Sequence, residues 1–133
     1  MKLGIVIYSN DPETAWNAVR FGNFALKQND TVRIFLLAKG VEIETLTPLE
    51  RPPMEVKTQP SSQGITENFL TGLNDPKFNI AQQLNDFVAN KGEILACGTC
   101  LKIRNKESTD VCPMSTMKDL YEIVKDSDRV VTF

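Results

Sequence analysis

The chain of 133 residues contains no histidine, and this absence excludes several kinds of site. Without an imidazole, neither a Cys-His dyad nor a Ser-His-Asp triad can form, so a reactive thiol would need backbone dipoles and cations to activate it. A structural zinc site requires four ligands, and the chain has only three cysteines. We therefore expect no metal, although three thiolates completed by Asp110 or by a second chain remain a rival arrangement.

Glycine-rich loops, charge of one sign and long apolar runs are also lacking. Tyr8-Ser9-Asn10-Asp11 lacks the glycines of a phosphate-binding loop, so we expect no nucleotide and no other cofactor. A net charge of −2 gives no general attraction to nucleic acid or to an anionic membrane. The first apolar run, residues 3–8, is too short for a signal peptide or a membrane span, so we expect a cytoplasmic location.

Short apolar runs rich in β-branched residues predict a parallel sheet. Residues 3–8, 31–38 and 93–97 have the pattern of strands that are covered on both faces, and residues 128–133 form a last strand. A weak fifth strand is expected near Asp110 to Cys112. Helices between consecutive strands predict right-handed crossovers.

Three helices are predicted from apolar spacing. The first begins at Asp11-Pro12, and the second ends at Asn90-Lys91-Gly92 with a C-terminal glycine. The third has Ser115 as its N-cap. Its predicted apolar face consists of Met114, Met117, Leu120, Tyr121 and Val124.

Three aromatic residues of the first helix lie off its apolar stripe of small residues, namely Trp16, Phe21 and Phe24. Such residues can cover a sheet edge or form a subunit contact, and we expect a homo-oligomer. Residues 41–77 are rich in proline and lack periodicity, apart from one possible helical turn near Val41 to Leu46. A connection this long favours a lid, an oligomer contact or a mobile segment. Residues 1–133 are thus predicted to form a single domain, a three-layer α/β/α fold with a mostly parallel sheet of four to five strands.

Two cysteines follow the third strand in Cys97-Gly98-Thr99-Cys100, where the ends of parallel strands gather reactive groups. A helix starting here, together with Lys102 and Arg104, would favour thiolates, and Gly98 would allow close approach of a partner sulfur. Alternatively, Cys97 is only a small buried apolar residue. Cys112 has no second signal and is interpreted as structural.

The stretch from Ile94 to Arg104 resembles the DsrE/DsrF-like (TusD-related) family of sulfur-relay proteins, as do the first strand with its Asp11-Pro12 helix start and the closing residues 128–133. The resemblance implies a parallel α/β fold, assembly into dimers, trimers or hexamers, and a cysteine that carries sulfur as a persulfide to or from partner proteins. Cys97 lies on the family's cysteine position. Cys100 is an addition, which could resolve a persulfide or a disulfide.

The leading hypothesis is therefore a sulfurtransferase-type relay protein with sulfur donor and acceptor proteins as partners. Cys97 and Cys100 are its candidate catalytic residues, supported by Gly98, Thr99, Lys102 and Arg104. A CxxC thiol-disulfide redox protein is the first alternative. A non-catalytic oligomeric or metal-binding subunit is the second. The basic residues after Cys100 are interpreted as a solvated face, so no direct contact with nucleic acid is expected.

Overall fold

A computed structural model describes residues 1–46 and 79–133 of the chain. The strands are β1 (Lys2–Ile7), β2 (Thr31–Leu36), β3 (Glu93–Cys97), β4 (Met114–Ser115) and β5 (Arg129–Thr132). The helices are α1 (Pro12–Lys27), the 3-10 helix η1 (Ala38–Thr45), α3 (Ile80–Ala89), α4 (Gly98–Ile103) and α5 (Met117–Asp126). The helical turn expected near Val41 to Leu46 is part of η1, whereas most of the proline-rich segment lies outside the described residues.

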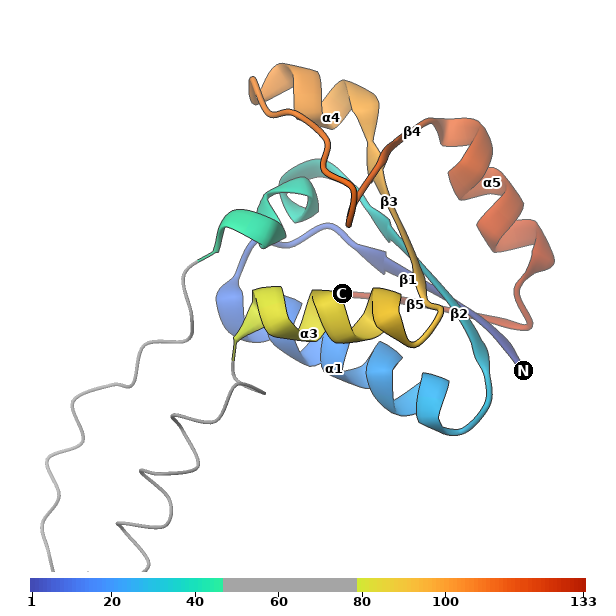
Figure 1. Cartoon of the computed structure of the whole chain (residues 1–133). Helices are drawn as coiled ribbons and strands as arrows, with labels where there is room; N and C mark the ends of the chain where they lie inside the picture. Colours follow the sequence, from blue (N-terminus) through green and yellow to red (C-terminus); the bar gives the residue numbers. More distant parts are fainter. Residues whose placement is uncertain (47–78) are drawn as a thin grey trace, which may run out of the picture.

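The five strands form one sheet in the order β4-β3-β2-β1-β5, and every pairing is parallel (Figure 1). This confirms the predicted α/β class. The weak fifth strand is β4, so its predicted position at Asp110 to Cys112 is wrong. The Cys112 N–H donates to the Thr109 hydroxyl at 3.1 Å, and pairing with β3 begins only where the Pro113 carbonyl accepts from the Ala96 N–H at 2.9 Å.

Helices cover both faces of the sheet, with α1 and α3 on one side and α5 on the other (Figure 1). A Cβ on Gly22 of α1 would lie 2.9 Å from the Phe87 ring of α3 and 3.3 Å from Ile5 of β1. On the opposite face, a Cβ on Gly4 would lie 2.9 Å from Ile123 of α5. Successive residues of β1, Gly4 and Ile5, therefore face different helix layers, as expected of a strand buried on both sides.

Helix α1 begins as predicted, because the Asp11 side chain accepts from the Thr14 N–H and Pro12 is the first helical residue. The placement of Trp16 outside the core is wrong, since it is buried and its ring lies 5.0 Å from the Arg20 guanidinium carbon. Phe21 and Phe24 are exposed, as their position off the stripe predicts.

The end of α3 differs from the predicted glycine cap. Lys91, with φ of 70°, is the left-handed residue, and the Gly92 N–H donates to the Phe87 carbonyl. A Cβ at Gly92 would lie 2.3 Å from the Phe87 ring. Glycine is therefore needed here for close packing rather than for its backbone angle.

Helix α5 corrects two predictions. Thr116 is its N-cap residue, whereas Ser115 belongs to β4 and its hydroxyl donates to Asp119. Ile123 is fully buried and Leu120 is partly buried against the sheet. The other members of the predicted apolar face are exposed, namely Met114, Met117, Tyr121 and Val124. The apolar residues of α5 therefore span more of the helix surface than the part that packs against the sheet.

Candidate functional site

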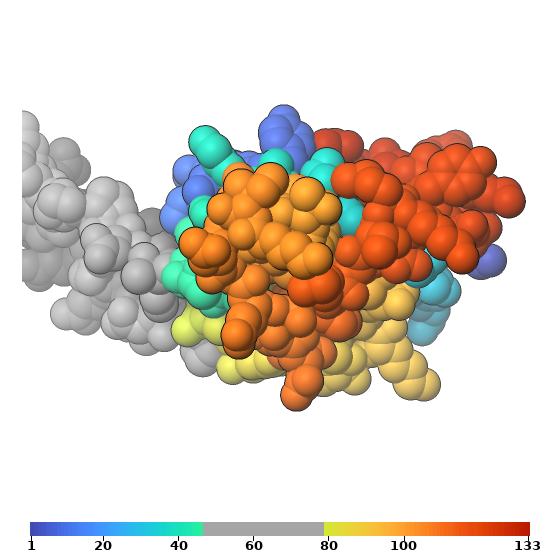
Figure 2. All heavy atoms as spheres, turned by 90° about the horizontal axis from the view of Figure 1, so that it is seen from above, coloured from blue at the N-terminus to red at the C-terminus, as the bar shows by residue number. Residues whose placement is uncertain are grey.

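Cys97 lies at the carboxyl end of the sheet, between two neighbouring strands. It is the last residue of β3 and the N-cap residue of α4, so the strand passes into the helix without a loop. Strand order places β2 on one side of it and β4 on the other. Seen from above, α4 occupies the middle of this end of the molecule, with η1 on one side and α5 on the other (Figure 2).

A hollow of about 330 Å³ lies beside Cys97, on the β4 side of β3. Its lining residues are Cys97, Gly98, Thr99, Lys102, Met114, Ser115, Thr116 and Met117. Cys97 is only 3% exposed, so its thiol is recessed rather than displayed on a convex surface. A Cβ on Gly98 would lie 2.9 Å from Met114 Cγ, which shows that this wall of the hollow approaches α4 closely.

Cys100 lies on the other side of Cys97, toward the end of β2. It is not among the residues that line the hollow, and its sulfur accepts the Ala38 N–H at 3.3 Å. Ala38 has a left-handed backbone with φ of 51°, an uncommon conformation for a residue other than glycine. Ala38, which follows the end of β2 by two residues, thus directs its N–H at the Cys100 sulfur.

The two thiols are hydrogen-bond partners. Burial, followed by the hydrogen bond to Cys97, raises the pKa of the Cys100 thiol above its usual range, although the Ala38 N–H and the Arg104 charge oppose this shift. The expectation that both thiols are shifted toward thiolate is therefore wrong for Cys100. A protonated Cys100 can donate its S–H to the Cys97 sulfur.

The two predicted cations occupy different surroundings. Lys102 lines the hollow with Cys97, so its ammonium is available to an anion there. Arg104 instead donates to the Cys100 carbonyl at 3.3 Å, and its Nε lies 3.4 Å from a Glu42 carboxylate oxygen. The Asn10 amide also donates to Glu42 at 2.8 Å and is the main cause of the lowered pKa of that carboxyl group.

Ser115 also belongs to the site, although the sequence pattern predicts it only as the N-cap of a helix. It is the register partner of Cys97 across β3 and β4, and the same hollow is lined by both residues. Its hydroxyl donates to the Asp119 carboxylate at 2.5 Å, which joins the wall of the hollow to the first turn of α5. Asp119 is the third residue of α5, so this hydrogen bond also stabilises the start of the helix.

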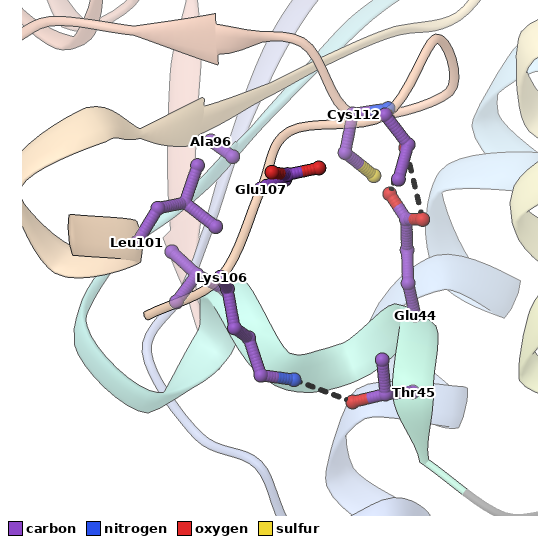
Figure 3. Close-up of a pocket in the computed structure, with 9 residues that line it drawn as sticks. Glu44, Thr45, Ala96, Leu101, Lys106, Glu107 and Cys112 are labelled. Carbon is purple, nitrogen blue, oxygen red and sulfur yellow. Dashed lines mark hydrogen bonds between the residues drawn. The ribbon is translucent and has the colours of Figure 1, made fainter. Parts of the chain in front are cut away.

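Cys112 is separate from the other two cysteines. It lines a different hollow, of about 200 Å³, where its sulfur points toward the Glu44 carboxylate (Figure 3). Burial, and then the hydrogen bond to Glu44, raise the pKa of the Cys112 thiol far above its usual range. The Thr109 hydroxyl donates to the same carboxylate at 2.6 Å. These surroundings suit an inert structural thiol.

The part of the chain that the structure describes contains no group of three or more His, Cys, Asp or Glu side chains that could hold a metal ion. Within residues 1–46 and 79–133, no helix has both the length and the apolar character needed to cross a membrane.

Three contributors to the site, Ala38, Met114 and Met117, were not identified from the sequence. Ala38 acts through its backbone N–H, which no residue type indicates. Met114 and Met117 read as core positions of a helix, but they form part of the wall of the hollow instead. By contrast, the C-G-T-C spacing after an apolar run pointed directly to Cys97 and Cys100.

Comparison with known proteins identifies relatives along the full length. A family profile described as "DsrE/DsrF-like family" matches residues 1–133. An uncharacterized protein of Methanocaldococcus jannaschii is 31% identical over 124 residues, which cover 91% of this chain and 88% of the relative. An uncharacterized protein of Methanopyrus kandleri is 30% identical over 134 residues, which cover 96% of this chain and 91% of the relative. Neither description assigns an activity.

Proposed function

The chain belongs to the DsrE/DsrF-like family, and on that premise we propose that Cys97 carries sulfane sulfur as a persulfide between a donor and an acceptor protein. One observation carries the proposal. Cys97 ends an interior strand, lines an open hollow and has a second thiol as its hydrogen-bond partner. A nucleophilic thiolate and space for a sulfur donor are what such a reaction requires.

Loading is written as Cys97–S⁻ attacking the outer sulfur of a donor persulfide, R–S–SH. The new bond joins Cys97 Sγ to that sulfur, the donor S–S bond breaks, and R–S⁻ leaves. The attacking thiolate receives S–H donation from Cys100, and Lys102 offers a positive charge to the anions that enter and leave. Gly98 leaves the approach to the sulfur free of a side chain, and Thr99 contributes a hydroxyl to the same wall.

The recessed position of Cys97 bears on its partners. Because only 3% of the residue is exposed, a donor cysteine must enter the hollow on a projecting or flexible segment. We propose that the partners are cytoplasmic sulfur donor and acceptor proteins of this kind. We also propose that the chain forms a homo-oligomer. The exposed Phe21 and Phe24 of α1 support this assembly.

A CxxC redox protein is the second candidate, favoured by the hydrogen bond between the two thiols. In that case Cys97 and Cys100 would cycle between dithiol and disulfide while reducing or oxidising a partner. Both variants, Cys97→Ser and Cys100→Ser, would then abolish turnover of a disulfide substrate to the same degree.

Intact mass spectrometry after incubation with a low-molecular-weight persulfide tests the carrier role. To prevent discharge by a second thiol, the parent protein is Cys100→Ser, which should gain about 32 Da, the mass of one sulfur. Adding Cys97→Ser should abolish this gain, because the attacking thiolate is gone. Adding Cys112→Ser is the matched control and should leave the gain unchanged, since that thiol occupies the other hollow. A parent protein that gains no sulfur would contradict the proposal.

A further inference from the structure

Cys97 lies between the hollow and the second thiol. The hollow is on the β4 side of β3, where Met114 and Ser115 form its wall. Cys100 is on the β2 side, where Ala38 follows the end of that strand and donates its N–H to the sulfur. The hollow therefore offers space for a sulfur atom added to Cys97, on the side that Cys100 does not line.

Thiol-disulfide exchange depends on which sulfur is attacked and on access to it. Cys100 has access to the inner sulfur, Cys97 Sγ, through the hydrogen bond between the two thiols. The outer sulfur of a Cys97 persulfide would be the leaving group, and it would face open space. The arrangement separates the attacking thiol from the exit of the released sulfur.

From this placement, and resting on the proposed persulfide at Cys97, we infer a further activity: Cys100 discharges the persulfide and releases its sulfur as hydrogen sulfide. The Cys100 sulfur attacks Cys97 Sγ, the bond between Cys97 Sγ and the outer sulfur breaks, and a Cys97–Cys100 disulfide forms. The chain is then a sulfane-sulfur reductase as well as a carrier.

The step balances without another reactant. Cys100–SH and Cys97–S–S⁻ give the disulfide and HS⁻, so the proton of Cys100 leaves with the sulfide. The Cys100 sulfur is oxidised from thiol to disulfide, and the outer sulfur is reduced from persulfide to sulfide. Lys102 lines the hollow into which HS⁻ departs, and its charge favours that anion.

The surroundings of Cys100 suit a thiol that acts only after loading. Its raised pKa keeps it protonated at neutral pH, so it does not compete with Cys97 for the incoming sulfur donor. The Ala38 N–H remains directed at its sulfur and can stabilise the negative charge that develops when the proton departs.

Return to the dithiol state requires an external thiol reductant, such as a dithiol, which reduces the disulfide and becomes oxidised itself. When one equivalent of persulfide is supplied and no reductant is added, the wild-type chain therefore releases at most one sulfide per Cys97. With a dithiol and excess persulfide, sulfide release continues.

The experiment compares wild type, Cys100→Ser, Cys100→Ala and Cys112→Ser, each reduced, freed of reductant and then given one equivalent of a low-molecular-weight persulfide. Sulfide is measured by a colorimetric assay and the protein by intact mass. Wild type and Cys112→Ser should release one sulfide per chain and end about 2 Da below the reduced mass, as a disulfide requires. Both Cys100 variants should retain the added sulfur, with sulfide release slower by on the order of tenfold or more.

The outcomes separate this inference from the carrier role. Wild type that retains the added sulfur as long as Cys100→Ser and Cys100→Ala overturns the inference and leaves the carrier proposal intact. Cys100 variants that fold, as judged by circular dichroism, but take up no sulfur overturn both.

Discussion

Cys97 and Ser115 face each other as register partners at the carboxyl end of the sheet, in strands β3 and β4. The wall of the hollow thus depends on a strand of only two residues. The loop before β4 is held to η1 by hydrogen bonds from Lys106 to Thr45 at 2.6 Å and from Thr109 to Glu44 at 2.6 Å. Changes in this loop are expected to alter access to Cys97 without touching the thiol.

Lys102 should accelerate loading from negatively charged donors. In the Cys100→Ser parent, replacing it as Lys102→Met should slow uptake of sulfur from glutathione persulfide by roughly two- to fivefold, because an exposed charge contributes little and is screened by salt. Lys106→Met is the matched control, since that ammonium donates to Thr45 and lines the other hollow. A time course of intact mass at low and high salt measures the effect. Equal rates for Lys102→Met and its parent would exclude this role.

Gly98 should be required for access rather than for stability. A Cβ there would lie 2.9 Å from Met114 Cγ, 3.1 Å from its sulfur and 3.2 Å from the Ser115 carbonyl oxygen, so the flexible, half-exposed Met114 side chain, which lines the hollow, must shift. We expect Gly98→Ala to change the free energy of unfolding by less than about 1 kcal/mol, because alanine also favours the helix. Loading of Cys97 should slow several-fold. Ile103→Ala is the control, because Ile103 belongs to the same helix, is exposed and does not line the hollow. It should load like wild type; slow loading by both variants would contradict the explanation.

The buried Cys112 thiol predicts a loss of stability at alkaline pH. Its pKa is raised in the folded state, so the unfolded chain releases this proton first, and the contribution to stability is lost as pH rises above about 8.5. At pH 10 the loss should be about 2 kcal/mol. Urea unfolding at pH 7 and pH 10 measures it, with Cys112→Ala as the comparison. The stability of Cys112→Ala should fall less than that of wild type between pH 7 and pH 10. An equal fall in both proteins would show that the Cys112 thiol is not the cause.

The exposed aromatic residues of α1 should form the contact between subunits. Phe24 is 61% exposed, and Phe24→Glu should convert the expected oligomer to a monomer, because a carboxylate cannot be buried without a partner. Tyr121→Glu on α5 is the control, since Tyr121 is equally exposed but belongs to another surface. Light scattering at micromolar concentration gives the mass. A wild-type chain that is monomeric would rule out the proposed assembly.

Local patterns in the sequence were sufficient to predict most of the secondary structure and the position of the candidate site. Continuous apolar runs marked β1, β2 and β3, because strands buried on both faces need apolar residues at successive positions. Asp11 and Pro12 marked the start of α1, since capping depends on the nearest residues alone. Cys97 and Cys100 were selected as candidate residues because their spacing and the preceding strand are both local features.

Tertiary structure decided which distant residues meet. The order β4-β3-β2 puts Ser115 on one side of Cys97 and Ala38 on the other, and nothing near these residues in the sequence indicates either contact. The same packing exposes much of the apolar face of α5 and places Cys112 against Glu44. A residue type reports its own tendency to be buried or to hydrogen-bond, whereas its partner depends on strand order, register and the path of the intervening chain.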